Sequence, residues 1–347
     1  MEAAHSSGSA DPHHFGRKRE YSTSNISYTI LGDGKYKEYN SKLMKKIQSV
    51  LEGHIPIKGP LTKKNFTVNS SFNNRRTKFE IQLYENDDIE RLEWNRKIHS
   101  NFSLAAKKID TTLDVSRLDA IDFPENEEDL AICRTFHKDQ KIIKQEHPDV
   151  YTHDRMGFAL RGLNGTYPSP EKVFTPEGRF SHLVGNSKFL KSIFVVSKVR
   201  CEIDSKSYCL SQHVTWTYQD HVTDPVKRMD DIPIMLLHQD LYLIEDTLNE
   251  IDTIFQRAIL WNKETGTIEN LIEDVGTIRY LLAHSMPYIR GSAAIAEWLE
   301  EAIFRSHDLD MQRVPEKPGD LAALASPTLD VFMNEEYRTT IQICNSK

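Results

Sequence analysis

Apolar residues recur three or four positions apart in four stretches of the chain, at residues 36–51, 234–259, 268–284 and 292–307. This spacing places the apolar side chains along one face of an α-helix. The sequence therefore predicts four amphipathic helices, three of which lie in the last third of the chain. After a loop at 315–320, Asp320 is expected to cap a final helix that continues to Tyr337.

A different pattern marks the middle of the chain. Apolar and polar residues alternate at 79–83, as in a half-buried strand. Two runs rich in β-branched and aromatic residues, at 191–204 and 208–218, flank a polar turn and predict a β-hairpin. Repeated glycines and prolines at 157–185 exclude long helices there. We expect a mainly α-helical fold with a small β-section around 155–218.

Chain length and composition indicate how the chain is organised into domains. The chain has 347 residues, of which 39% are hydrophobic and 27% charged, so it is long enough to bury a sizeable core. Residues 1–25 are small, polar and basic, and we expect them to form a disordered tail. Residues 26–345 are expected to form a single domain. It would contain a helical region at 86–117, the β-rich lobe around 155–218 and a helical C-terminal part at 234–340.

Charge and cysteine content exclude several classes of protein. A net charge of −7 argues against a dedicated nucleic-acid binder. No apolar run reaches the ~18 residues of a membrane span, and the tail lacks the apolar region of a cleavable signal peptide. The four cysteines form no CxxC pair and have no histidine at zinc-finger spacing. We expect reduced thiols and no metal site, although Cys201 and Cys209 are candidates to face each other across the hairpin.

The segment AHSMPYIRGSAAI, residues 283–295, is the most unusual local sequence. It joins two predicted helices and places Arg290 just before Gly291 and small residues at the start of the next helix. A helix N-terminus presents unpaired N–H groups and a partial positive charge, which suit a phosphate. Arg290 would add a bidentate contact to that phosphate. A plain helix start with close helix packing explains the same residues, and both interpretations remain open at this point.

The block HSMPYIRGSAAIAEW closely resembles the signature segment of AvrB, avirulence protein B of plant pathogens, and its relatives. The likeness extends backward through FQRAILWNKETGTIENLIEDVGTIRYLLAHSMP. It continues forward through HDLDMQRVPEKPGDLAALASPTLDVFMNEEYR, in the same order of helix, aspartate-bearing loop and terminal helix. The resemblance is strongest over residues 234–340. It implies a bilobal, mainly helical fold related to Fic/Doc proteins.

The resemblance also implies a function and a set of site residues. AvrB-like proteins are secreted bacterial effectors whose pocket takes a nucleotide or nucleotide sugar and is associated with rhamnosyl transfer onto a host protein. By position, Arg290, His238 and Asp320 match the family's pocket arginine, histidine and aspartate, and they are the expected catalytic residues. The expected nucleotide-binding residues are Arg290, Gly291, Ser292, His284 and Arg228. No metal is expected.

Two departures from the family pattern limit this expectation. The Fic signature HxFxDGNGR is absent, so nucleotidyl transfer by the usual Fic mechanism is unsupported. The chain begins Met1-Glu2 rather than Met-Gly, so we expect no N-terminal myristoylation signal of the kind that the relatives carry. We expect an effector in the host cytoplasm that transfers a glycosyl group from a nucleotide-activated donor to a host protein. The alternatives are a non-enzymatic effector that binds a host protein, and an AMP transferase with a diverged Fic-like pocket.

Overall fold

A computed structural model describes most of the chain outside its middle third. The described residues are 15–19, 28–31, 36–57, 59–84, 192–203, 206–218, 224–230, 232, 234–239, 241–264, 266–288 and 290–345. The helical region expected at 86–117 and the stretch at 157–185 lie outside these residues, as does most of the lobe expected around 155–218.

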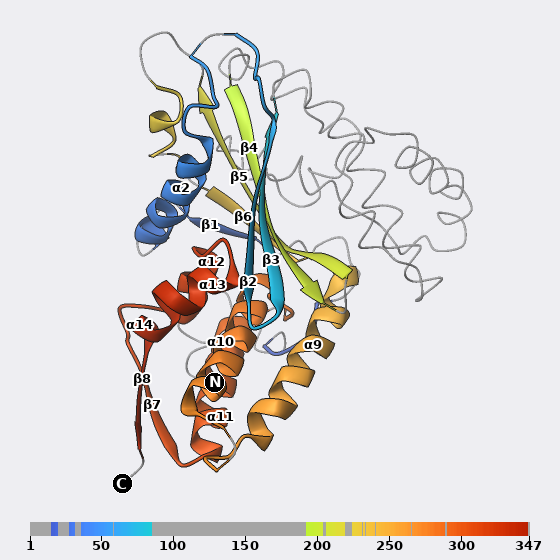
Figure 1. The fold of residues 1–347 in the computed structure, drawn as a ribbon, viewed down its shortest axis with the longest axis vertical. Coiled ribbons are helices and arrows are strands. Elements are labelled where there is room, and N and C mark those ends of the chain that lie inside the picture. The colour runs from blue at the N-terminus through green and yellow to red at the C-terminus, as the bar shows by residue number, and fades with distance from the viewer. Residues whose placement is uncertain are drawn as a thin grey trace, which may run out of the picture. The chain divides into compact units, whose positions relative to one another are not determined.

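Along the described residues, most strands come before residue 239 and most helices come after it (Figure 1). The strands are β1 (Tyr28–Leu31), β2 (Asn65–Phe72), β3 (Arg75–Tyr84), β4 (Ser192–Ile203), β5 (Lys206–Tyr218), β6 (Ile234–His238), β7 (Leu309–Arg313) and β8 (Ile341–Asn345). The α-helices are α2 (Lys37–Leu51), α9 (Leu241–Leu260), α10 (Ile268–Ser285), α11 (Ser292–Ser306), α12 (Gly319–Leu324), α13 (Leu329–Val331) and α14 (Arg338–Thr340). A 3₁₀ turn, η4 (Lys227–Met229), and a π-helical turn, η5 (Phe332–Tyr337), complete the described elements.

The β-structure is larger than the expected small β-section. Six strands form one sheet in the order β1-β6-β5-β4-β3-β2, and β7 pairs with β8 in a separate two-stranded sheet. The fold is therefore mixed α/β rather than mainly α. The sequence did not predict the larger sheet, in part because β2 has a single buried residue, Phe66, and shows no clear alternation of apolar and polar residues. The expected hairpin is confirmed as β4 and β5, which pair antiparallel.

The two cysteines of this hairpin are not cross-strand partners. Cys209 lies opposite Arg200, and Cys201 lies opposite Tyr208. Neither of these two thiols forms a disulfide, and both are buried. A bulge between Val199 and Arg200 shifts the register by one residue, which a sequence pattern does not reveal.

Two of the predicted helices have different boundaries in the structure. The helix expected at 234–259 divides into strand β6 and helix α9, because the apolar run IMLLH pairs antiparallel with β1. Short apolar runs fit either a strand or a buried helix. The helix expected after Asp320 is interrupted into α12, α13 and η5, and Pro318 rather than Asp320 occupies the N-cap of α12. The other predicted helices are confirmed as α2, α10 and α11.

The chain divides into two compact units. One unit comprises residues 1–20, 69–77 and 238–347, and the other comprises 21–68 and 78–237. In the second unit, α2 buries Leu43, Met44, Ile47 and Leu51. In the same unit the side chain of Asn40 accepts a hydrogen bond from the Ile234 N–H at 2.9 Å and donates to the Ile232 carbonyl at 3.2 Å. This amide fixes the start of β6 against α2.

Helix α10 forms the core of the first unit. It is buried on nearly every side from Leu271 to Ser285 and packs against α9, α11, α12 and η5. Figure 1 shows α9 and α10 running alongside each other. Gly276 permits the close approach of η5, because a Cβ at this position would lie 2.5 Å from Met333 Sδ and 2.7 Å from Tyr337 Cδ1.

Replacing Gly276 by alanine is expected to lower the free energy of unfolding by about 1–3 kcal/mol, the usual cost of overpacking a core. Alanine has the higher helix propensity, worth about 0.5–1 kcal/mol, so the clash must exceed this gain. Denaturant unfolding of Gly276→Ala measures the change. Met333→Ala in the same background should recover part of the loss, and an unchanged or higher stability of the single variant would contradict the packing described.

Residues 15–19 differ from the disordered tail expected at 1–25. The Gly16 N–H donates to the Arg290 carbonyl at 3.0 Å, and the Arg19 N–H donates to the Pro287 carbonyl at 2.9 Å. These contacts join residues some 270 positions apart, which a local reading of composition cannot detect.

Candidate functional site

Two of the predicted site residues, His238 and His284, meet inside the first unit. His238 ends β6 and His284 lies in the last turn of α10, and neither is accessible to solvent. His238 Nδ1 lies 3.3 Å from the carbonyl oxygen of His284. Because a carbonyl oxygen only accepts, this nitrogen carries the proton. The Gln239 N–H donates to the same oxygen at 3.3 Å, so β6 is fastened to the end of α10.

His284 connects this crossing to the helix that carries Asp320. Its Nε2 donates to the Ala323 carbonyl of α12 at 3.1 Å, and its ring lies 4.4 Å from that of Tyr280. Burial lowers the pKa of His284 to about 3, although the bond to Ala323 opposes the shift. The ring is therefore neutral near pH 7, and its Nε2 proton is already donated to the protein. Any contact with a phosphate would have to come from a neutral imidazole.

Stability is expected to fall by about 2 kcal/mol between pH 7 and pH 5 through His284 alone. The unfolded chain binds a proton near pH 6.5, whereas the folded chain does so only near pH 3, so acid favours unfolding. Urea unfolding of wild type and His284→Gln at both pH values isolates this effect. Burial raises the pKa of Glu300 and gives the opposite pH dependence in both proteins, so the difference between them cancels it. An equal pH dependence in the two proteins would contradict the assignment.

The predicted phosphate segment forms a tight loop between α10 and α11. Gly291 is the N-cap of α11 and has a φ of 84°, in the left-handed region that favours glycine. The Ser292 hydroxyl accepts from the Tyr288 N–H at 3.1 Å and donates to the Tyr288 carbonyl at 3.2 Å. Arg290 is half-buried in this loop. The loop thus presents Arg290 immediately before the first turn of a 15-residue helix.

Asp320 belongs to a buried charge cluster centred on Arg279. The Arg279 side chain is 1% exposed, and its Nη2 lies 3.8 Å from Asp320 Oδ1 and 3.4 Å from Glu297 Oε1. Its Nη1 lies 3.8 Å from Glu300 Oε2. The Tyr337 hydroxyl donates to Glu300 Oε1 at 2.8 Å. We name Arg279, Glu297, Glu300 and Asp320 the Arg279 cluster.

A cavity of about 280 Å³ adjoins the Arg279 cluster, and Arg313, Lys317 and Gly319 also line it. Sequence reasoning missed Arg279. The available signal was an arginine inside the apolar run IRYLLAH, because a buried arginine requires acidic partners. The partners come from α11 and α12, and no sequence spacing reveals that these helices converge on α10.

The remaining predicted nucleotide-binding residue, Arg228, belongs to the second unit. It is exposed in η4, and its N–H donates to the Asp224 carbonyl at 3.3 Å. The structure therefore brings His238 and His284 together and connects them to α12, which carries Asp320. Arg290, Gly291 and Ser292 follow from the end of α10 in the same unit.

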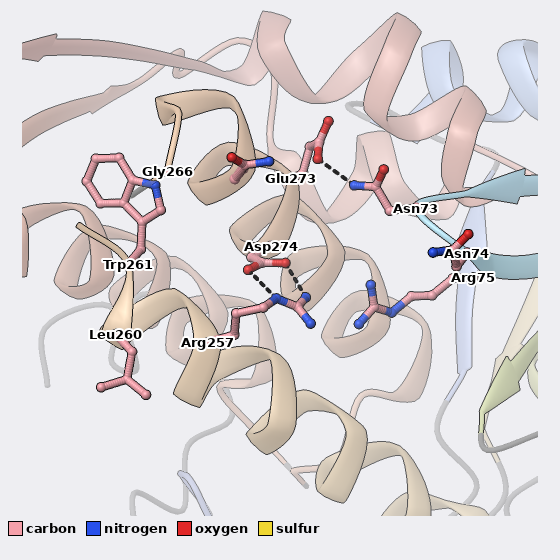
Figure 2. Close-up of a pocket in the computed structure, with 10 residues that line it drawn as sticks. Asn73, Asn74, Arg75, Arg257, Leu260, Trp261, Gly266, Glu273 and Asp274 are labelled. Atoms are coloured by element: carbon pink, nitrogen blue, oxygen red, sulfur yellow. Dashed lines mark hydrogen bonds and ion pairs between the residues drawn. The ribbon is translucent and has the colours of Figure 1, made fainter. Parts of the chain in front are cut away.

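A wider pocket of about 790 Å³ lies elsewhere in the first unit, where the β2–β3 turn meets α9 and α10. Figure 2 shows the side chains of Arg75 and Arg257 pointing toward one another across it. Arg257 Nε donates to Asp274 at 2.7 Å, and Arg75 Nε donates to Glu250 at 3.1 Å. None of the predicted site residues lines this pocket. Carboxylates compensate both guanidinium groups, so the pocket carries no excess positive charge for a phosphate.

The described residues contain neither a membrane-spanning helix nor a metal-binding cluster. No helix in this part of the chain is both long and apolar enough to cross a bilayer. No group of three or more His, Cys, Asp or Glu side chains among the same residues is arranged to hold a metal ion.

Comparison with known protein families gives a match to part of the chain. Residues 186–341 match the AvrB_AvrC family, described as avirulence protein. The match contains β4 to β7, α9 to α13, and every predicted site residue. Residues 186–341 therefore belong to the AvrB/AvrC family of avirulence proteins. Comparison with individually curated proteins gives no match.

Proposed function

We propose that this avirulence protein binds a nucleotide or nucleotide sugar at the start of α11 and transfers its glycosyl group to a host protein. Avirulence proteins are effectors delivered into host cells, so the acceptor would be a host protein. The proposal rests mainly on the loop that places Arg290 and Gly291 at the N-terminus of α11, within the matched segment. We also propose that the chain has the bilobal, Fic/Doc-related architecture of the family.

The chemistry of this loop suits a diphosphate. The first N–H groups of α11 point out of the helix, and its dipole favours negative charge there. Arg290 would add a forked pair of donors to the phosphate oxygens. In the transfer step, an acceptor hydroxyl oxygen attacks the anomeric carbon, the bond from that carbon to the diphosphate oxygen breaks, and the nucleoside diphosphate leaves with the electron pair. Arg290 and the helix terminus would stabilise the charge that develops on it.

His238 and Asp320 would act around this centre. His238 would take the proton of the acceptor hydroxyl as a general base, and the hydrogen bond from its Nδ1 to the His284 carbonyl would orient the ring. Asp320 is about one-fifth exposed and would accept hydrogen bonds from sugar hydroxyls while its other contact is to Arg279. In this scheme His284 positions His238 through its backbone carbonyl.

A second candidate is a non-enzymatic effector that acts by binding a host protein. The full burial of His238 favours it, because a general base must reach the acceptor hydroxyl. Mass analysis of host proteins exposed to wild type or Arg290→Ala tests the two candidates. A sugar increment that disappears in the variant supports the transferase. A nucleotide increment would indicate nucleotidyl transfer instead, and an unmodified partner that both proteins bind would favour the second candidate.

A further inference from the structure

The N-terminal segment 15–19 lies directly on the loop that leads into α11. Besides the two backbone hydrogen bonds from Gly16 and Arg19, Phe15 forms a parallel bridge with Arg290, and Lys18 forms an antiparallel bridge with Tyr288. We name residues 15–19 the strap. Its backbone contacts Pro287, Tyr288 and Arg290, which lie at or just before the proposed ligand site.

Arg19 anchors one end of the strap. Its residue is 7% exposed, and its Nη2 donates to the Gln239 carbonyl at 2.5 Å and to the Ser285 carbonyl at 3.2 Å. Ser285 is the last residue of α10, where backbone carbonyls lack helical partners and favour a positive charge. Lys18 adds an exposed ion pair of 2.9 Å with Glu245 of α9. The buried guanidinium therefore fixes this end of the strap.

Phe15 covers the site at the other end. A Cβ built on Gly291 would lie 2.5–2.8 Å from the Phe15 ring, so the ring occupies the space directly over the N-cap of α11. The centre of the ring also lies 5.6 Å from the centre of the Trp298 ring, further along α11. A phosphate that approaches Gly291 and the first turn of α11 must share this space with Phe15.

We propose that the strap is a built-in gate, in which Phe15 closes the start of α11 and must withdraw before a diphosphate binds. This inference rests on the proposed ligand site at α11. The strap competes as part of the same chain, so the apparent affinity for the ligand falls with the fraction of molecules in the open state. The different burial of the two ends assigns them different parts: Arg19 retains the strap, and Phe15 moves.

Two readouts on the 347-residue chain test the gate. Hydrogen exchange reports closure without any ligand, because the Gly16 and Arg19 amides are protected only while they donate to Arg290 and Pro287. Calorimetry with inorganic pyrophosphate and with UDP reports access. Phe15→Ser and Arg19→Gln remove the cover and the anchor, and Ile57→Ser is the matched control, since Ile57 is an exposed apolar residue outside the strap.

The gate predicts that both strap variants lose amide protection and bind pyrophosphate about tenfold more tightly than wild type. In wild type, saturating pyrophosphate should also accelerate exchange at Gly16. If the strap variants lose protection while their affinities stay within twofold of wild type, the gate is refuted but the ligand site stands. If no variant binds either probe at millimolar concentration, both proposals fail. A tightening shared by Ile57→Ser would also overturn the gate.

Discussion

Replacing Arg279 by methionine is expected to lower the free energy of unfolding by about 3–5 kcal/mol, the usual cost of removing one partner from a buried ion pair. The variant would leave Glu300 buried without the Arg279 guanidinium, with Glu297 and Asp320 beside it. Methionine has nearly the length of the arginine stem, so the loss would reflect charge rather than a cavity.

Arg313→Met provides the matched control. Arg313 pairs with Glu301 and approaches Glu297 at 3.9 Å, but its side chain is 35% exposed. An exposed pair of this kind contributes about 0–1 kcal/mol. Denaturant unfolding of both variants measures the difference. Equal losses in the two would show that the Arg279 cluster is not the electrostatic centre of the first unit.

Arg290→Lys is expected to weaken binding of a nucleoside diphosphate almost as much as Arg290→Ala, by about ten- to a hundredfold. Lysine keeps the charge but loses the forked donors that fit two phosphate oxygens. Folding should change little, because Arg290 is half-buried in a loop whose geometry depends on Gly291 and Ser292.

A purely structural role of Arg290 would give a different pair of results. If Arg290 only supports the loop, Arg290→Ala will lower the melting temperature while the affinity for the diphosphate stays unchanged. Measuring both quantities on the same protein separates the two roles. The Arg290→Lys variant adds a second comparison, since recovery of full affinity with lysine would show that charge alone suffices.

Local patterns predicted the elements whose apolar residues recur at a regular spacing. The spacing of apolar residues gave α2, α10 and α11, and the alternation at 79–83 gave β3. The sequence did not distinguish β6 from a helix, because the choice depends on β1, some 200 residues away in the chain. Strands β7 and β8 were not predicted for a similar reason, since each is only five residues long and pairs with a strand that is not adjacent in the sequence.

The sequence alone suggests a candidate site only where chemistry and local structure coincide. The loop at 287–291 combines an arginine, a glycine and a helix start within a few residues, so the sequence pointed to it directly. The Arg279 cluster and the strap depend on contacts between α10 and residues on other elements. From sequence alone, charged residues such as Arg279 and Arg19 are expected to be exposed to solvent. Only the packing in the structure shows that both are buried.

The proposed ligand site can be tested by calorimetric titration of the wild-type protein with nucleoside diphosphates and nucleotide sugars. The proposed site predicts saturable binding of at least one of these ligands at millimolar concentration or below. It also predicts that Arg290→Ala weakens the same binding by ten- to a hundredfold, as estimated from the loss of charge-assisted hydrogen bonds, at about 1.5–3 kcal/mol. Absence of binding by every ligand at millimolar concentration would contradict the claim.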